Sequence, residues 1–161
     1  MSYDLLVFEP DAAPRERQGF LDWYHHLTEW SEGHDYNDPA SSNVALQAWY
    51  RDMLPQFPAM NGPDGVSDDD PSLDTGFVTG YTCARTAMYL DFRWSVAKEA
   101  YDQTLMCAAR HGIGFFDVSA ENGAVWLPAS DGYRVAHGGG PGDREIEHAL
   151  EKWLASQPRT R

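Results

Sequence analysis

Apolar residues recur along this chain at two spacings, and each spacing predicts a type of element. Over residues 43–57 the apolar side chains lie three or four positions apart, from Leu46 to Phe57. This is the spacing of one face of an amphipathic helix. The same spacing predicts helices over about residues 11–28, 95–111 and 143–155. Short runs rich in aromatic and β-branched residues predict strands at 2–8, 76–84, 86–92, 113–119 and 124–127.

The predicted elements follow the order β-α-α-β-β-α-β-β-α. Without the second helix and the C-terminal additions this becomes β-α-β-β-α-β, the ferredoxin-like or split βαβ order. We therefore expect an α+β fold: an antiparallel sheet with helices on one face, an extra helix after the first helix and an appended helix at 143–156. Residues 130–142 contain three consecutive glycines and are interpreted as a flexible linker. The chain is expected to form a single domain over residues 1–161, with its core in about residues 2–128.

Charge is distributed unevenly over the 161 residues. The formal net charge is −13; residues 1–80 contain 15 Asp and Glu against 3 Arg, whereas residues 81–161 contain 10 against 9 Lys and Arg. Nucleic acids and anionic membranes attract Lys and Arg, so this excess argues against both as partners. A patch of one sign raises the association rate with a partner of opposite sign. We therefore expect a basic protein partner.

The remaining sequence features predict a cytoplasmic protein without a cofactor. Its longest apolar run is too short to span a bilayer, and its first residues lack the basic region of a signal peptide. Cys83 and Cys107 lie in apolar surroundings without a CxxC spacing. Two reduced thiols are therefore expected.

Residues 28–74 concentrate the acidic side chains of the chain. This stretch contains ten carboxylates, and its one basic residue is Arg51. Trp30 and Tyr36 are the aromatic residues of the stretch that fall outside the predicted helical faces. Aromatic side chains surrounded by acidic ones are typical of binding hot spots. We predict a partner-binding surface that consists of Glu29, Trp30, Glu32, His34, Asp35, Tyr36, Asp38, Asp68, Asp69 and Asp70.

Two alternatives to a binding surface remain. A metal-dependent enzyme would use His25 and Glu29, one helical turn apart, with His34 folding back from the loop; such ligands suit Zn²⁺ or Fe²⁺. Their spacing matches no established motif such as HExxH, so solvent-exposed polar side chains are the competing interpretation. The other alternative is a small-ligand-binding ferredoxin-like domain, for which fold alone is no argument. With no catalytic motif in the sequence, an enzyme is not expected.

Two segments carry a resemblance to known proteins. FEP…FLDWYHHLTEWSEGHDYNDP, and HGIGFFDVS followed by VWLP, resemble small acidic bacterial proteins from polymorphic-toxin or type VI secretion loci. The resemblance extends from Leu6 to about Leu127 and includes no catalytic motif, so it assigns no residue roles. It implies an immunity protein, made in the cytoplasm to neutralise a cognate toxin. Such a protein would dock its acidic and aromatic surface on the basic active site of the toxin.

Overall fold

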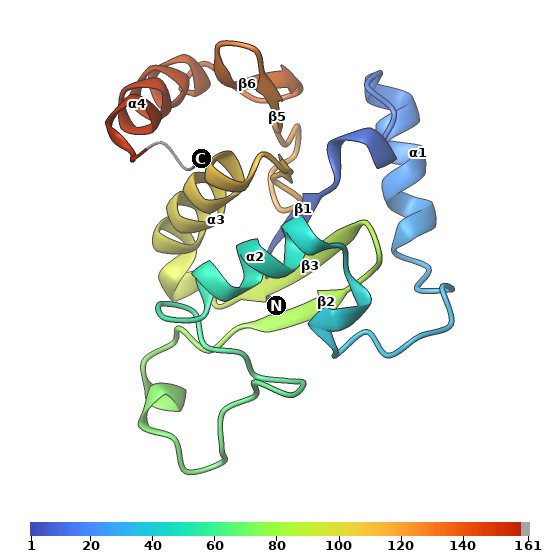
Figure 1. The fold of residues 1–161 in the computed structure, drawn as a ribbon, viewed down its shortest axis with the longest axis vertical. Coiled ribbons are helices and arrows are strands. Elements are labelled where there is room, and N and C mark those ends of the chain that lie inside the picture. Colours follow the sequence, from blue (N-terminus) through green and yellow to red (C-terminus); the bar gives the residue numbers. More distant parts are fainter. Residues whose placement is uncertain (159–161) are drawn as a thin grey trace.

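A six-stranded antiparallel sheet forms the centre of the computed structural model, which describes residues 1–158 (Figure 1). Its strands run across the sheet in the order β2-β3-β1-β4-β5-β6, and each neighbouring pair is antiparallel. β1 therefore has a strand on either side. The strands are β1 Tyr3–Phe8, β2 Gly80–Cys83, β3 Ala87–Phe92, β4 Gly114–Phe116, β5 Val125–Ala129 and β6 Gly132–His137.

Helices cover both faces of this sheet, and the expectation that they lie on one face is wrong. The described residues form four α-helices: α1 Arg17–Leu27, α2 Val44–Met53, α3 Ala97–His111 and α4 Asp143–Ser156. Leu5 and Val7 of β1 share a core with α2, α3 and α4, whereas Leu6 and Phe8 pack with α1 (Figure 1). Successive side chains of a strand point to opposite faces. The uninterrupted apolar run of β1 therefore requires cover on both sides.

Local sequence explains where the helices begin and end. The Asn43 side chain accepts a hydrogen bond from the Leu46 N–H and caps α2. Gly112, with φ of 65°, ends α3 in the left-handed conformation. The first helix begins later than predicted, because Pro10–Ala12 form a separate 3-10 turn. The Glu16 carboxylate then caps α1 through the N–H groups of residues 18 and 19.

The predicted linker at 130–142 contains a strand instead. β6 pairs with β5 as a hairpin, and Tyr133 is buried, with its hydroxyl donating to the Ile113 carbonyl at 2.7 Å. Its ring stacks on Trp126. The N–H of Val135 donates to Glu147 of α4. Residues 130–131 form the hairpin turn, and the segment after His137 is irregular. The alternation of Tyr133 and Val135 is the strand signal that the glycine run obscured.

The remaining long connection joins α2 to β2 through residues 54–79. It contains the 3-10 turn Pro71–Asp74 and one isolated bridge between Ala59 and Thr79. The strand predicted from residue 76 begins only at Gly80. Within residues 1–158, no helix combines the length and the apolar character needed to cross a membrane.

Candidate functional site

Trp30 and Tyr36 lie together in the connection between α1 and α2. Their rings meet edge to face with centroids 5.3 Å apart, and Trp30 makes a second such contact with Tyr89 of β3 at 5.9 Å. Trp30 also has a φ of 54°, a conformation that costs a non-glycine residue about 1 kcal/mol or more. Both aromatic side chains are half-buried. The packing therefore holds them in one position at the surface.

Glu32 fixes this connection to the end of the β2–β3 hairpin. Its carboxylate accepts a hydrogen bond from the Arg85 N–H at 2.9 Å and lies 2.7 Å from His34 Nε2. Burial alone would raise the pKa of Glu32, but the hydrogen bonds and charges of His34 and Arg85 bring it below its ordinary value. The Tyr36 hydroxyl accepts from the Glu32 N–H, and the Tyr36 carbonyl accepts from the Cys83 N–H. Glu32 therefore has a structural role as well as a charge.

The other acidic residues of this connection differ in how freely they face solvent. Asp35 and Asp38 each accept a nearby backbone N–H at 2.9 Å and so order the loop. Glu29 is exposed, with its carboxylate 3.6 Å from His26 Nδ1. The structure thus brings together seven of the ten predicted binding residues. We call these the α1–α2 surface: Glu29, Trp30, Glu32, His34, Asp35, Tyr36 and Asp38.

The acidic triplet Asp68 to Asp70 lies in a different connection. Asp70 accepts hydrogen bonds from the N–H and hydroxyl of Ser72, and Asp69 accepts from the Ser67 hydroxyl. Figure 1 shows most of the 54–79 segment at the lower left and the α1–α2 connection at the right. The two connections meet at Asn61, whose side-chain amide donates to Asn37 Oδ1 at 2.7 Å. The ten predicted residues therefore come from two connections.

The three residues of the alternative metal site do not converge. His25 is exposed on α1 beside the ring of Tyr24, Glu29 faces His26, and His34 is bonded to Glu32. Across residues 1–158 there is no group of three His, Cys, Asp or Glu side chains that could hold a metal ion.

The thiols likewise lack the environment of a nucleophile. Cys83 and Cys107 are free and buried. Burial raises the pKa of the Cys83 thiol to about 12 and that of Cys107 to about 11. A thiol attacks as its thiolate, so neither side chain is poised for covalent catalysis.

A polar pocket next to Trp30 was not predicted. It has a volume of about 470 Å³ and lies where α1 leaves the sheet uncovered. Strand alternation aims Asp4, Thr82, Tyr89 and Asp91 at this face, and Trp30 forms part of its wall. We call it the α1-face pocket; its lining is Ser2, Asp4, Tyr24, Thr28, Trp30, Thr82, Tyr89 and Asp91.

Asp4 and Asp91 face each other directly across β1 and β3. Asp4 accepts hydrogen bonds from the Tyr89 hydroxyl at 2.6 Å and from the Ser2 hydroxyl at 2.5 Å. Burial raises the pKa of Asp91, and the charge of Asp4 raises it further. The only sequence signal was an aspartate within each apolar strand. Their proximity depends on the strand register, which the sequence does not specify.

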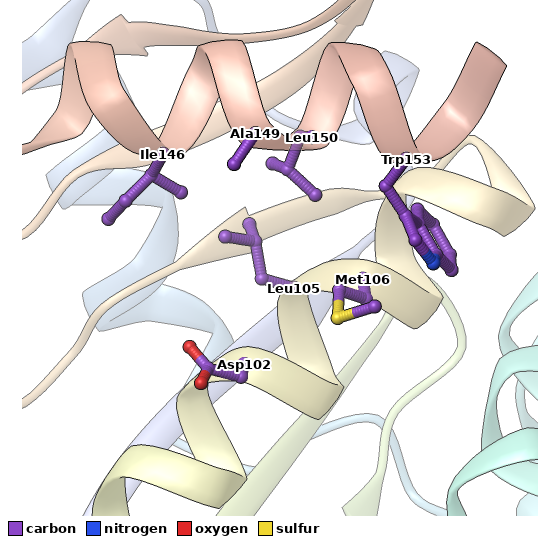
Figure 2. A pocket seen from close by; sticks show the side chains of 7 residues that line it. All are labelled: Asp102, Leu105, Met106, Ile146, Ala149, Leu150 and Trp153. Atoms are coloured by element: carbon purple, nitrogen blue, oxygen red, sulfur yellow. The ribbon is translucent and has the colours of Figure 1, made fainter. Parts of the chain in front are cut away.

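A second hollow, between α3 and α4, is apolar and has a volume of about 310 Å³. Figure 2 shows Leu105 and Met106 of α3 facing Leu150 and Trp153 of α4, with Asp102 as the one charged lining residue. The Arg110 guanidinium lies over the Trp153 ring, 5.2 Å from its centroid. This lining can pack against apolar groups, but it holds no set of side chains suited to acid–base or nucleophilic chemistry.

The geometry therefore supplies one acidic and aromatic region, formed by the α1–α2 surface and the adjoining α1-face pocket. The two share Trp30, which contacts Tyr36 on one side and Tyr89 on the other. Comparisons with protein-family models, with curated proteins and with solved structures gave no match for this chain.

Proposed function

We propose that this chain is a non-catalytic binding protein, and specifically an immunity protein that neutralises a cognate bacterial toxin in the cytoplasm. The observation that carries the proposal is the continuity of the α1–α2 surface with the α1-face pocket through Trp30. Together they present carboxylates and aromatic rings on the α1 face of the sheet and beside β2, whose Cys83 N–H donates to the Tyr36 carbonyl. The natural complement is a basic protein surface, such as the substrate-binding site of a toxin that acts on an anionic substrate.

The internal contacts of the α1–α2 surface favour tight binding. Ordering flexible side chains at an interface costs free energy, and a surface ordered beforehand avoids most of that cost. Trp30 and Tyr36 are already packed against one another, and Glu32 is held by Arg85 and His34. Excess negative charge in the first half of the chain would also speed the encounter with a basic partner.

The second candidate function is small-ligand binding by a ferredoxin-like domain. We assign β1 to β4, with the spatial order β2-β3-β1-β4, to a split βαβ unit in which α2 and α3 share one face. In this assignment α1 is the addition, and the α1-face pocket is the ligand site. The specific observation in its favour is the size of that pocket, about 470 Å³, within the range of ligand sites.

Growth rescue tests the proposed function. The product of the adjacent reading frame would be expressed in a bacterial host with and without this chain. An immunity protein restores growth and forms a 1:1 complex that survives gel filtration. Failure to restore growth against a toxic neighbouring product would contradict the proposal.

Variants of the α1–α2 surface sharpen this test. Glu29→Lys combined with Asp35→Asn alters the charge while Asn keeps the oxygen that accepts the Asn37 N–H. Glu29 and Asp35 are both exposed, so the fold should tolerate the change. Glu121→Lys is the matched control, because Glu121 is also exposed but lies in the β4–β5 connection. We expect rescue to weaken in the double variant and to persist in the control.

A further inference from the structure

We propose that the α1-face pocket is a receptor for a guanidinium group, supplied by one arginine side chain of a protein partner. The inference rests on the proposed function, which supplies the partner that carries the arginine. It goes beyond that function by naming the side chain of the partner that binds and the pocket that receives it. Three independent features carry it: the cavity, its aromatic wall and an uncompensated pair of carboxylates.

The first feature is space. A volume of about 470 Å³ far exceeds the ~30 Å³ that one water occupies in the liquid. The pocket therefore has room for an organic side chain. Its floor is the sheet, and its walls are the C-terminal end of α1 and the residues that follow it.

The second feature is the aromatic wall. Tyr24, Trp30 and Tyr89 all line the pocket. Trp30 meets Tyr89 edge to face. Indole and phenol faces attract organic cations, and a flat guanidinium also stacks on them.

The third feature is the charge of Asp4 and Asp91. Residues directly opposite each other on neighbouring strands have Cβ atoms about 4.5–5.5 Å apart, and like charges there repel. Within residues 1–158 neither carboxylate takes part in an ion pair, and the pocket lining includes no Lys, Arg or His. The protein itself leaves this pair without a counter-charge.

Guanidinium fits these features better than a metal ion or an ammonium group. Calcium takes six to eight oxygen ligands, whereas this pocket offers two carboxylates and has aromatic walls. Ammonium is a compact point charge, while guanidinium presents five donors in a plane. One such plane can bond both Asp4 and Asp91 and lie against the Trp30 ring.

A titration of the isolated chain with N-acetyl-argininamide tests the assignment by two-dimensional NMR. We expect saturable shifts confined to the Trp30 indole N–H and to the backbone amides of Asp4, Thr82 and Asp91. N-acetyl-citrullinamide, which is neutral and of similar shape, should not bind. N-acetyl-lysinamide should bind more weakly, and equal binding would overturn the guanidinium assignment. Much tighter binding of free arginine than of the blocked amide would assign the pocket to a small molecule instead.

Variants locate the site. Asp91→Asn removes one charge-assisted hydrogen bond and should weaken binding about tenfold, whereas Glu121→Gln should leave it unchanged. Asp4→Asn is the second variant, so that a folding defect in either one does not decide the question. Unchanged binding in both aspartate variants would overturn the proposal.

The two proposals fail separately. Growth rescue without binding of the arginine probe would support the immunity function and contradict the guanidinium site. Binding of the probe without growth rescue would support the guanidinium site and contradict the immunity function.

Discussion

Replacing Asp91 with asparagine should stabilise the protein at neutral pH. Asp91 faces Asp4 across two strands, and burial together with the charge of Asp4 raises the pKa of its carboxyl. A directly opposed pair of like charges costs about 0.2–1 kcal/mol. Asparagine removes the repulsion and keeps the shape, so we expect a gain of that size in the free energy of unfolding at pH 7.

The gain must depend on pH with a defined sign. A carboxyl whose pKa is higher in the folded state binds protons more tightly there than in the unfolded chain. Its penalty is therefore complete above the folded-state pKa and absent below the unfolded-state pKa of about 3.9. The advantage of Asp91→Asn should accordingly disappear as the pH falls to about 3.

Urea unfolding of both proteins at pH 7 and pH 3 measures this difference. Asp68→Asn is the control for the change in net charge, because Asp68 is exposed in the 54–79 connection. A destabilised Asp91→Asn protein at pH 7, or an equal gain at both pH values, would refute the assigned repulsion. If Asp91 is present for binding and not for stability, its replacement is expected to stabilise the protein.

Three further outcomes concern the scaffold. Trp49→Ala should destabilise the protein by about 3–5 kcal/mol in denaturant titrations, because Trp49 is fully buried and donates to the Thr104 carbonyl. Gly112→Ala should cost about 1–2 kcal/mol by the same measurement, since the φ of 65° is strained for alanine although no atom obstructs its methyl group. Asp52→Asn should reduce the loss of stability on acidification, because the ionised Asp52 stabilises the folded protein. Burial would raise the pKa of Asp52, but hydrogen bonds and charges from His111 and Arg110 bring it below its ordinary value. The stability that Asp52 contributes is present above its unfolded-state pKa and is lost as the pH falls through its folded-state pKa. Free energies of unfolding, measured at a series of pH values for both proteins, test this.

Helix and strand positions followed closely from local pattern, because amphipathic spacing and caps act over a few residues. The apolar residues of α2 fall on one face, as their spacing predicts, and the Asn43 side chain caps the helix. β6 escaped detection because its signal is a short alternation around Tyr133, immediately before three glycines. The sequence of elements also does not state which side of a sheet each helix covers, and α1 took the opposite face from α2 and α3.

The sequence predicted the α1–α2 surface but not the α1-face pocket. Glu29 to Asp38 are close in the chain, so their clustering could be predicted. Asp4 and Asp91 are far apart in the chain, and they became neighbours through the register of β1 against β3. The one sequence signal for the pocket is an aspartate in each of two otherwise apolar strands. A charged side chain destabilises a strand unless the sheet face to which it points is accessible to solvent.

Association kinetics test the central claim most directly, namely that the region formed by the α1–α2 surface and the α1-face pocket binds a basic protein. The purified product of the adjacent reading frame would be mixed with this chain by stopped flow over a range of salt concentrations. Electrostatic steering predicts an association rate that falls about tenfold or more from low to high salt, and a slower rate for the combined Glu29→Lys and Asp35→Asn variant. An association rate that is independent of salt and unchanged in that variant would contradict the claim.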